Sequence, residues 1–278
     1  MVYADLHVHT TASDGLLSLE EVIKEAKSEK LGAIAVTDHD TVNPNLKKRV
    51  EKRNGLEVVS GTEIKAIHRD TKIEILCYFV DPSDNSLQEL FDEMRGNRIN
   101  RMKEMVERFN SMDTGIKLGW KEIVESAGGP VGRPHFARAI ANKGLTQGSR
   151  EAFDKYAKED KYPYVSLERP DAKRVIELAH DSSALTSLAH PCTEEIEDFE
   201  SFLDSLVDLG LDCCETYYPY SESPKSTTLD PEEVKGIIDR FGLFKTGGSD
   251  FHNRKSFKMG AAGVSRGTLE EIKEAVGV

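Results

Sequence analysis

The chain has 278 residues, of which 38% are hydrophobic and 31% are charged, and its formal net charge at pH 7 is −12. This composition predicts a soluble globular protein, either one large α/β domain or a barrel with an insertion. The negative charge argues against a broad surface for duplex nucleic acid, and no apolar run approaches the ~20 residues that span a bilayer.

The cysteines and the first residues bear on the cellular compartment. Of the four cysteines, Cys77 and the adjacent Cys213 and Cys214 fall in apolar, strand-like runs. This pattern is typical of buried reduced thiols rather than of a disulfide framework. The first residues lack the basic region and apolar segment of a signal peptide. We therefore expect a cytoplasmic protein.

Apolar runs rich in β-branched residues alternate with segments of helical period. The runs predict strands at residues 3–8, 33–37, 57–60, 73–80, 184–188, 212–216 and 243–246. The periodic segments predict helices at 18–29, 43–52, 169–180, 194–209, 230–241 and 268–276. Such alternation indicates a parallel sheet or a closed barrel, and polar residues at several strand ends favour the barrel. We predict a distorted, TIM-like (β/α)7 barrel.

One stretch interrupts the alternation. Residues 87–112, 119–127, 133–143 and 150–156 have helical period, and no strong strand lies among them. We therefore expect a barrel made of residues 1–97 and 166–278. Residues 98–165 would form a small helical insertion beside its mouth and act as a substrate cap.

Histidines accompanied by carboxylates or hydroxyls recur at the predicted strand ends. The segments are D-L-H-V-H at 5–9, T-D-H-D at 37–40, G-T-E at 61–63, A-H-P at 189–191 and G-S-D-F-H at 248–252. One H-x-H pair is weak evidence, but structural histidines have no reason to gather at one end of a barrel. Imidazoles and carboxylates together suit divalent transition metals. The pattern predicts a polymetal site.

Two further histidines are expected to be structural. His68 lies in a polar segment and is predicted to be a solvated turn residue. His180 lies near a predicted helix C-terminus, where an imidazolium interacts favourably with the helix dipole.

In order and content these motifs resemble those of the polymerase and histidinol phosphatase (PHP) family, and they run from residue 5 to residue 252. The segment G-R-P-H-F-A-R at 132–138 resembles the branch that contains nucleoside 3′,5′-bisphosphate phosphatases and 5′-to-3′ oligoribonucleotide exonucleases. The resemblance implies the PHP fold, a distorted (β/α)7 barrel, with a site for up to three divalent metals.

The resemblance also implies which residues hold each metal. The first metal would be held by His7, His9, Glu63 and Asp250, the second by Glu63 as a bridge with His190, and the third by Asp14, His39 and His252. We expect two to three divalent ions. Imidazole and carboxylate ligands favour Mn²⁺, with Zn²⁺, Fe²⁺ or Mg²⁺ as alternatives.

One position departs from the family pattern. Relatives usually carry a histidine eleven residues after the bridging glutamate, where this chain has Glu74. We predict that Glu74 is a metal ligand, and its harder donor oxygen favours Mn²⁺ or Mg²⁺ over Zn²⁺. The alternatives are a weak second metal site and a solvent-facing Glu74 on an edge strand.

Basic residues of the insertion are candidates for phosphate binding. Arg133 and His135 lie at the start of a predicted helix, where backbone N–H groups and an arginine fork favour phosphate. Both also match a family substrate-binding motif. A second basic run lies at residues 95–103 of a predicted helix, and Arg98 is its best candidate for phosphate binding. Alternatively, this run is a solvated face of the helix and has no function.

We predict a metal-dependent phosphoesterase, a phosphoric ester hydrolase. Its substrate would be a small phosphorylated nucleotide, such as a nucleoside 3′,5′-bisphosphate, or the 5′ end of short single-stranded RNA, attacked by a metal-activated hydroxide. His190, His252 and Asp38 are candidates for supplying the proton to the leaving oxygen. We expect a monomer or weak oligomer with neither duplex nor membrane partners. The alternatives are a histidinol-phosphate-type monoester phosphatase and a catalytically impaired metal-binding module.

Overall fold

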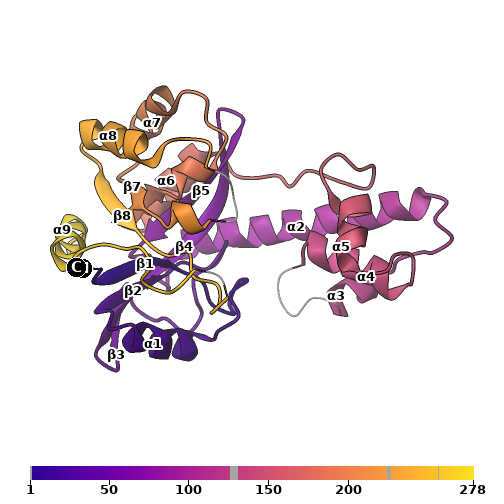
Figure 1. Cartoon of the computed structure of the whole chain (residues 1–278), viewed down its shortest axis with the longest axis horizontal. Coiled ribbons are helices and arrows are strands. Elements are labelled where there is room, and N and C mark those ends of the chain that lie inside the picture. Colours follow the sequence, from indigo (N-terminus) through magenta and orange to yellow (C-terminus); the bar gives the residue numbers. More distant parts are fainter. Residues whose placement is uncertain (1, 126–130, 224–226, 256) are drawn as a thin grey trace. The chain divides into compact units, whose positions relative to one another are not determined.

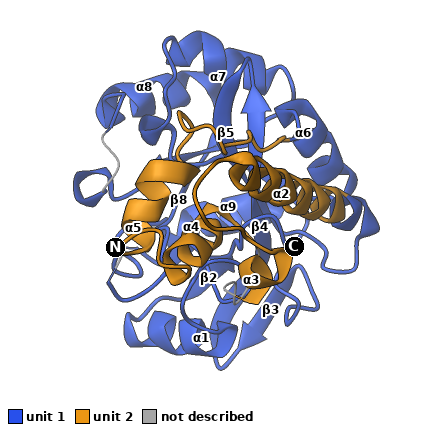
Figure 2. Cartoon of the chain, turned by 90° about the vertical axis from the view of Figure 1, so that its right-hand side faces the viewer, with its two compact units in different colours: residues 1–89, 170–278 blue, residues 90–169 orange. Residues whose placement is uncertain are grey.

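The computed structural model describes residues 2–125, 131–223, 227–255 and 257–278. The chain divides into two compact units, unit 1 with Met1–Glu89 and Pro170–Val278, and unit 2 with Leu90–Arg169 (Figure 2). The predicted insertion, residues 98–165, falls within unit 2.

Unit 1 is built on one curled sheet (Figure 1). Its strands in the described ranges are β1 (Ala4–Val8), β2 (Ala33–Val36), β3 (Val50–Arg53), β4 (Leu56–His68), β5 (Thr71–Tyr78), β6 (Leu185–Leu188), β7 (Cys213–Tyr217) and β8 (Phe244–Gly247). The order is β1-β2-β4-β5-β6-β7-β8, and β3 pairs with β4 beside this path. At the ends of the order, Val8 forms a parallel bridge to Phe251, just after β8. The seven strands of the path correspond to the seven predicted strands.

The direction of β5 makes the sheet mixed rather than parallel throughout. This strand runs antiparallel to both of its neighbours, β4 and β6, whereas the other pairs along the path are parallel. The long strand β4 pairs with β2 through its first half and with β5 through its second half. Glu63 therefore lies inside β4 rather than beyond the predicted strand end at residue 60, and Glu74 lies inside β5 as predicted.

The helix predicted at residues 43–52 is wrong. The chain instead forms a loop that leads into β3, and β3 turns back into β4 through Asn54 and Gly55. These two residues have φ values of 52° and 86°, the conformation that an Asn-Gly hairpin turn favours. Earlier in the loop, the Asn43 side chain is buried and donates a hydrogen bond to Asp38. Local hydrogen bonding and the turn therefore override the helical period.

The helices of unit 1 are α1 (Leu19–Ser28), α6 (Ala172–Asp181), α7 (Phe199–Val207), α8 (Pro231–Phe241) and α9 (Arg266–Ala275), with short 3-10 turns η2 (Pro191–Thr193) and η3 (Tyr220–Glu222). α1 begins with the capping box that its sequence predicts, because Ser18 and Glu21 each bond to the other's backbone. Val22 and Ile23 of this helix belong to the same buried cluster as the strand residues Ile34 and Val58.

Unit 2 is helical in the described residues. It contains most of α2 (Asn85–Ser111), then α3 (Trp120–Glu125), α4 (Arg133–Asn142), α5 (Ser149–Ala152) and the π-helical turn η1 (Phe153–Ala157). α2 continues without interruption through Gly96. Phe109 of α2 packs edge-on against Phe136 and Tyr156, which gives the unit its own apolar core. Of the described helices, none is both long and apolar enough to cross a membrane.

Candidate metal centre

The predicted metal ligands converge within unit 1. His7 belongs to β1 and His9 follows it, whereas His39, His190 and Asp250 follow β2, β6 and β8. Parallel strands bring their carboxyl ends to one edge of a sheet, which gathers these loops. Glu63 and Glu74 join them from the hairpin β4–β5, because β5 runs in the opposite direction and so presents its first half at this edge.

The loops that carry His190 and Asp250 have an unusual backbone. Both residues are non-glycine with positive φ, 25° for His190 and 53° for Asp250. Such conformations cost free energy and tend to occur where the surroundings fix a functional side chain. Gly248 allows the loop that carries Asp250 to approach β1 closely, since a Cβ at residue 248 would lie 2.3 Å from the Cβ of His7.

Four side chains surround a first cation position. The Nε2 atoms of His7 and His9 are 3.1 Å apart. His7 Nε2 lies 3.3 Å from Glu63 Oε1 and 3.5 Å from Asp250 Oδ1. His9 Nε2 lies 3.4 Å from Glu63 Oε2 and 3.2 Å from Asp250 Oδ1. Donors about 2.0–2.2 Å from one ion are roughly 2.8–3.6 Å from each other in tetrahedral or octahedral coordination, so this donor set fits a divalent metal.

A second position lies beside Glu63. His190 Nε2 is 3.2 Å from Glu63 Oε1 and 3.1 Å from Glu74 Oε2. Glu194 adds a carboxylate oxygen 3.5 Å from the other ring nitrogen of His190. Glu63 therefore faces both the first and the second position, as a bridging carboxylate does.

Asp14 marks a third position, nearer to solvent. Its Oδ1 lies 3.2 Å from His252 Nε2, and its Oδ2 lies 3.6 Å from His39 Nε2. The Nδ1 atom of His9 is 3.8 Å from Asp14 Oδ1. Asp14 itself is 55% exposed, so this position is the one most open to solvent.

Two observations favour cations at these positions. His9 Nδ1 is buried and has no hydrogen-bond partner among the described residues. Burial, together with the neighbouring imidazoles of His39 and His252, lowers the pKa of His9 to about 4, so this ring is neutral and can coordinate a metal. An orphaned polar atom and a neutral imidazole inside a carboxylate cluster suit a metal centre.

The remaining groups hold compensating charges when no metal is bound. Burial alone would lower the pKa of His7 and His190, but the surrounding carboxylates raise it well above the ordinary value. The pKa of Glu63 is correspondingly lowered, despite burial, by His39 and His7. Protons on the imidazoles thus take the place of cations in the metal-free protein.

Asp38 and Asp5 hold the loops rather than face the centre. The buried Asp38 carboxylate accepts hydrogen bonds from the Thr10 amide and hydroxyl at 2.7 and 2.8 Å and from the Ser13 hydroxyl at 2.7 Å. The buried Asp5 carboxylate accepts from the Ser249 amide and hydroxyl. These bonds tie down the segments that carry Asp14 and Asp250. For Asp38, this geometry favours a positioning role over proton donation.

A family model called PHP domain matches residues 5–181. The chain belongs to the PHP family. Its solved structural neighbours include a protein described as a metal-dependent phosphoesterase from Bifidobacterium adolescentis, with a TM-score of 0.77, 26% identity, and coverage of 99% of this chain and 96% of that one. The family and this neighbour confirm the predicted PHP fold and support dependence on metal, without identifying the ion.

Two relatives extend the similarity over nearly the whole chain. The 5′-3′ exoribonuclease Rnm of Salmonella typhimurium is 29% identical over 257 residues, which cover 90% of this chain and 85% of that protein. The 3′,5′-nucleoside bisphosphate phosphatase of Chromobacterium violaceum is 25% identical over 255 residues, which cover 91% and 88%.

Besides Glu194, three residues that contact the metal centre were not predicted from the sequence. Glu215 of β7 is buried, lies 3.1 Å from His7 Nδ1 and accepts a hydrogen bond of 2.8 Å from the His190 amide. The Tyr218 hydroxyl donates to Asp250 Oδ2. Lys65 forms an ion pair with Glu74. None of these residues stands in a sequence motif. For Glu215, the alternation of side-chain direction along the predicted strand 212–216 could have indicated an inward-facing carboxylate.

We expect Glu215→Gln to weaken metal binding about 10- to 100-fold, the usual effect of removing a partner that orients a metal-bound histidine. The carboxylate holds the His7 ring by its Nδ1 atom, and an amide binds an imidazole N–H more weakly. Equilibrium dialysis against Mn²⁺ measures the change. Glu57→Gln is the control, because Glu57 pairs with Lys273 instead. Unchanged affinity would show that Glu215 only fills space.

His68 corrects a sequence expectation. It ends β4 and is buried, with Nε2 2.7 Å from the Ser205 hydroxyl and its ring edge-on to Phe202. It therefore packs against α7 instead of occupying a solvated turn, as the long β4–β5 hairpin carries it over that helix. His180 is structural as expected and pairs with Asp212 at 2.9 Å.

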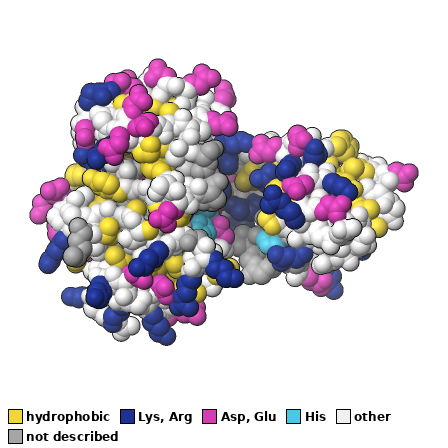
Figure 3. Space-filling model, in the orientation of Figure 1, with side chains coloured by type: hydrophobic (Ala, Val, Ile, Leu, Met, Phe, Trp, Pro, Cys, Tyr) yellow, Lys and Arg dark blue, Asp and Glu magenta, His cyan; other side chains and the backbone are white. Residues whose placement is uncertain are grey.

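The predicted phosphate-binding residues lie in unit 2. His135 Nδ1 accepts a hydrogen bond from the Gly132 amide at the start of α4. Arg133 lies over the rings of Phe153 and Tyr164, and its nearest carboxylate is that of Glu159, 3.8 Å away. Figure 3 shows basic side chains on this face of unit 2, interspersed with acidic and hydrophobic ones.

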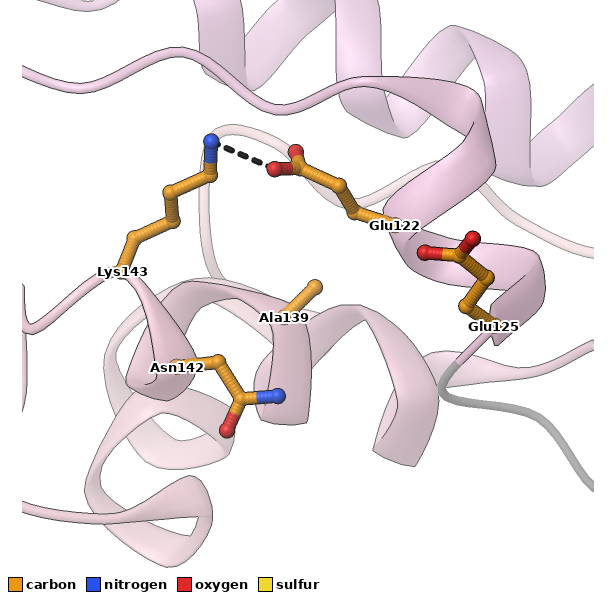
Figure 4. Close-up of a pocket in the computed structure, with 5 residues that line it drawn as sticks. All are labelled: Glu122, Glu125, Ala139, Asn142 and Lys143. Carbon is orange, nitrogen blue, oxygen red and sulfur yellow. Dashed lines mark ion pairs between the residues drawn. The ribbon is translucent and has the colours of Figure 1, made fainter.

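Unit 2 also contains a shallow pocket of about 360 Å³. Its lining residues are Glu122, Glu125, Ala139, Asn142 and Lys143 (Figure 4). The ion pair between Lys143 and Glu122 spans one side. None of the predicted phosphate-binding residues lines it, so we assign it no role.

Proposed function

We propose that the chain is a metal-dependent phosphoesterase that hydrolyses a phosphate ester of a small nucleotide, such as a nucleoside 3′,5′-bisphosphate, or of the 5′ end of short RNA. The observation that carries this proposal is the set of imidazoles and carboxylates around Glu63, whose spacing fits shared divalent cations. The named activities of its relatives indicate the substrate class.

The ligand assignment is part of the proposal and is supported by the distances between the side chains. We assign His7, His9 and Asp250 to the first position, His190 and Glu74 to the second, and Glu63 to both. Asp14, His39 and His252 would hold the third. Oxygen donors from four carboxylates favour Mn²⁺ among the candidate ions. When bound, such ions would lower the pKa of an attacking water and neutralise charge on the phosphoryl oxygens.

The residues of the chain have separate tasks in this scheme. Arg133, Arg98 and His135 would bind a phosphate of the substrate, since guanidinium forks and helix N-termini both favour phosphate oxygens. Of the candidates for proton donation, His252 is the most accessible, with 24% of its side chain exposed against 3% for His190. A metal-bound imidazole has lost the proton that it would donate, so His252 would act on the leaving oxygen only while the third position holds no ion.

We further propose a cytoplasmic, monomeric or weakly oligomeric protein that does not act on duplex nucleic acid. The net charge of −12 supports the last point, because duplex binding draws much of its free energy from basic surface.

A panel of three substrates tests the proposed function. With Mn²⁺ present, kcat/KM is measured on a nucleoside 3′,5′-bisphosphate, a short 5′-phosphorylated RNA and histidinol phosphate. We expect one or both nucleotide substrates to be preferred by at least about tenfold, which corresponds to 1.4 kcal/mol. Preference for histidinol phosphate would overturn the nucleotide proposal, and metal-replete protein inert on all three would indicate a binding module.

Two arginine variants refine this experiment. Arg133→Ala should raise KM for the nucleotide substrate with little change in kcat, because it removes a contact to a phosphate that does not react. Arg95→Ala serves as the control, since Arg95 is 60% exposed and pairs with Asp92 on the surface of α2.

A further inference from the structure

Lys65 and Glu74 form a pair at the edge of the metal centre. They are directly opposite each other in the antiparallel hairpin β4–β5, and Lys65 Nζ lies 2.8 Å from Glu74 Oε1. Both side chains are largely removed from solvent, with 24% and 14% exposure. A half-buried ion pair of this kind is held by its strands and is weakly screened by salt.

The two oxygens of Glu74 face different partners. Oε1 contacts the ammonium of Lys65, whereas Oε2 lies 3.1 Å from His190 Nε2. That same nitrogen is 3.2 Å from Glu63 Oε1, so Oε2 completes the donor set of the second position. Glu74 can therefore coordinate an ion through one oxygen while the other keeps its lysine partner.

The charges of Glu74 and Lys65 explain why the two residues are paired. The carboxylate of Glu74 adds one negative charge to the centre, and a buried charge needs a partner. Lys65 supplies one positive charge and also lies 3.2 Å from the ring nitrogens of His39. The pair as a whole is therefore neutral, as a single imidazole ligand would be.

We propose that Lys65 is the charge-compensating residue of the second metal position, so that the Lys65–Glu74 pair brings a carboxylate donor to this position without adding net charge. This inference rests on the metal centre assigned under the proposed function. The ion at the second position feels one attractive charge from Glu74 and one repulsive charge from Lys65.

Four proteins test the inference through metal binding alone. They are the wild type, Glu74→His, Lys65→Met and the double variant, and the affinity of each successive Mn²⁺ ion is measured by equilibrium dialysis with elemental analysis. The charge at the second position is unchanged in the double variant, one unit more positive in Glu74→His and one unit more negative in Lys65→Met. Each unit should change the affinity of that ion by about tenfold or more.

The expected order follows directly. Lys65→Met should bind the second-position ion most tightly, the wild type and the double variant should agree within about threefold, and Glu74→His should bind it most weakly. Lys52→Met is the matched control, since Lys52 is exposed on β3, and it should behave as the wild type.

Three results would overturn the inference. If Lys65→Met lowers the affinity for the second-position ion, Lys65 merely supports the hairpin. The same conclusion holds if adding Lys65→Met to Glu74→His does not restore that affinity. If the wild type binds two ions and only the double variant binds three, the pair excludes the second ion instead of compensating it. Thermal unfolding of each metal-free variant identifies any that fail to fold. Because these measurements use no substrate, they can fail independently of the activity assays that test the proposed function.

Discussion

Replacing Glu63 by glutamine is expected to lower kcat/KM by about 10³-fold or more and to remove at least one bound ion per chain. Glu63 Oε1 lies 3.3 Å from His7 Nε2 and 3.2 Å from His190 Nε2, and its Oε2 lies 2.9 Å from His39 Nδ1. Glutamine keeps the shape but loses the charge and presents an N–H₂ group to one set of ligands. A loss of about 4 kcal/mol in transition-state stabilisation corresponds to this factor.

The matched control for this variant lies on the same strand. Glu57→Gln makes the same chemical change near the start of β4, where the carboxylate pairs with Lys273, and should keep ion content and rate close to wild type. Elemental analysis after dialysis gives the ion content, and steady-state kinetics on the preferred nucleotide gives the rate. A Glu63→Gln protein with wild-type ion content and turnover would show that no ion is shared through this residue.

The fold was predictable where short-range patterns determine it. Apolar runs located all seven strands of the path, and Ser18 with Glu21 marked the start of α1. The pairing direction of β5 was not predictable in this way, because an apolar run reads the same in either direction. The hairpin β3–β4 did have a local signal in Asn54-Gly55, and its turn geometry outweighs the helical period that precedes it.

For the metal centre, the ligands that stand in short motifs were predictable from the sequence. The residues that contact those ligands and hold them in place were not. His7, His190 and Asp250 stand in short segments of unusual composition, so their gathering was foreseeable. Glu215 follows two cysteines in an apolar strand, and only the curl of the sheet brings it to His7 and His190. Lys65 became meaningful only once the register placed it opposite Glu74.

The affinity for metal is expected to rise steeply with pH between about 6.5 and 8.5. In the metal-free protein, burial alone would lower the pKa of His252, but Asp14 and Asp250 raise it to about 9. Despite burial, carboxylates likewise raise the pKa of His7 and His190 well above the ordinary value, and that of His39 above it. A raised pKa means that each proton stays bound below that value, so an incoming ion must displace it.

The size of the effect follows from the number of protons displaced. An ion that displaces one proton gains about tenfold in apparent affinity per pH unit, and one that displaces two gains about a hundredfold. The third position, with both His39 and His252, should therefore show the steepest dependence. Titration calorimetry in buffers of different ionisation enthalpy counts the protons, and about four should leave as all positions fill.

Stability of the metal-free protein should change in the opposite direction over the same range. Histidines whose folded pKa is raised contribute stability that is full below the unfolded value of about 6.5 and is lost as pH rises through the folded value. The metal-free Tm should thus fall toward pH 9, and added Mn²⁺ should reverse the fall because the ions replace the lost protons. His180→Gln, which removes a histidine paired with Asp212 outside the centre, should leave the pH dependence of metal affinity intact. Affinity that is constant from pH 6.5 to 8.5 would rule out these imidazoles as the ligands that exchange protons for metal.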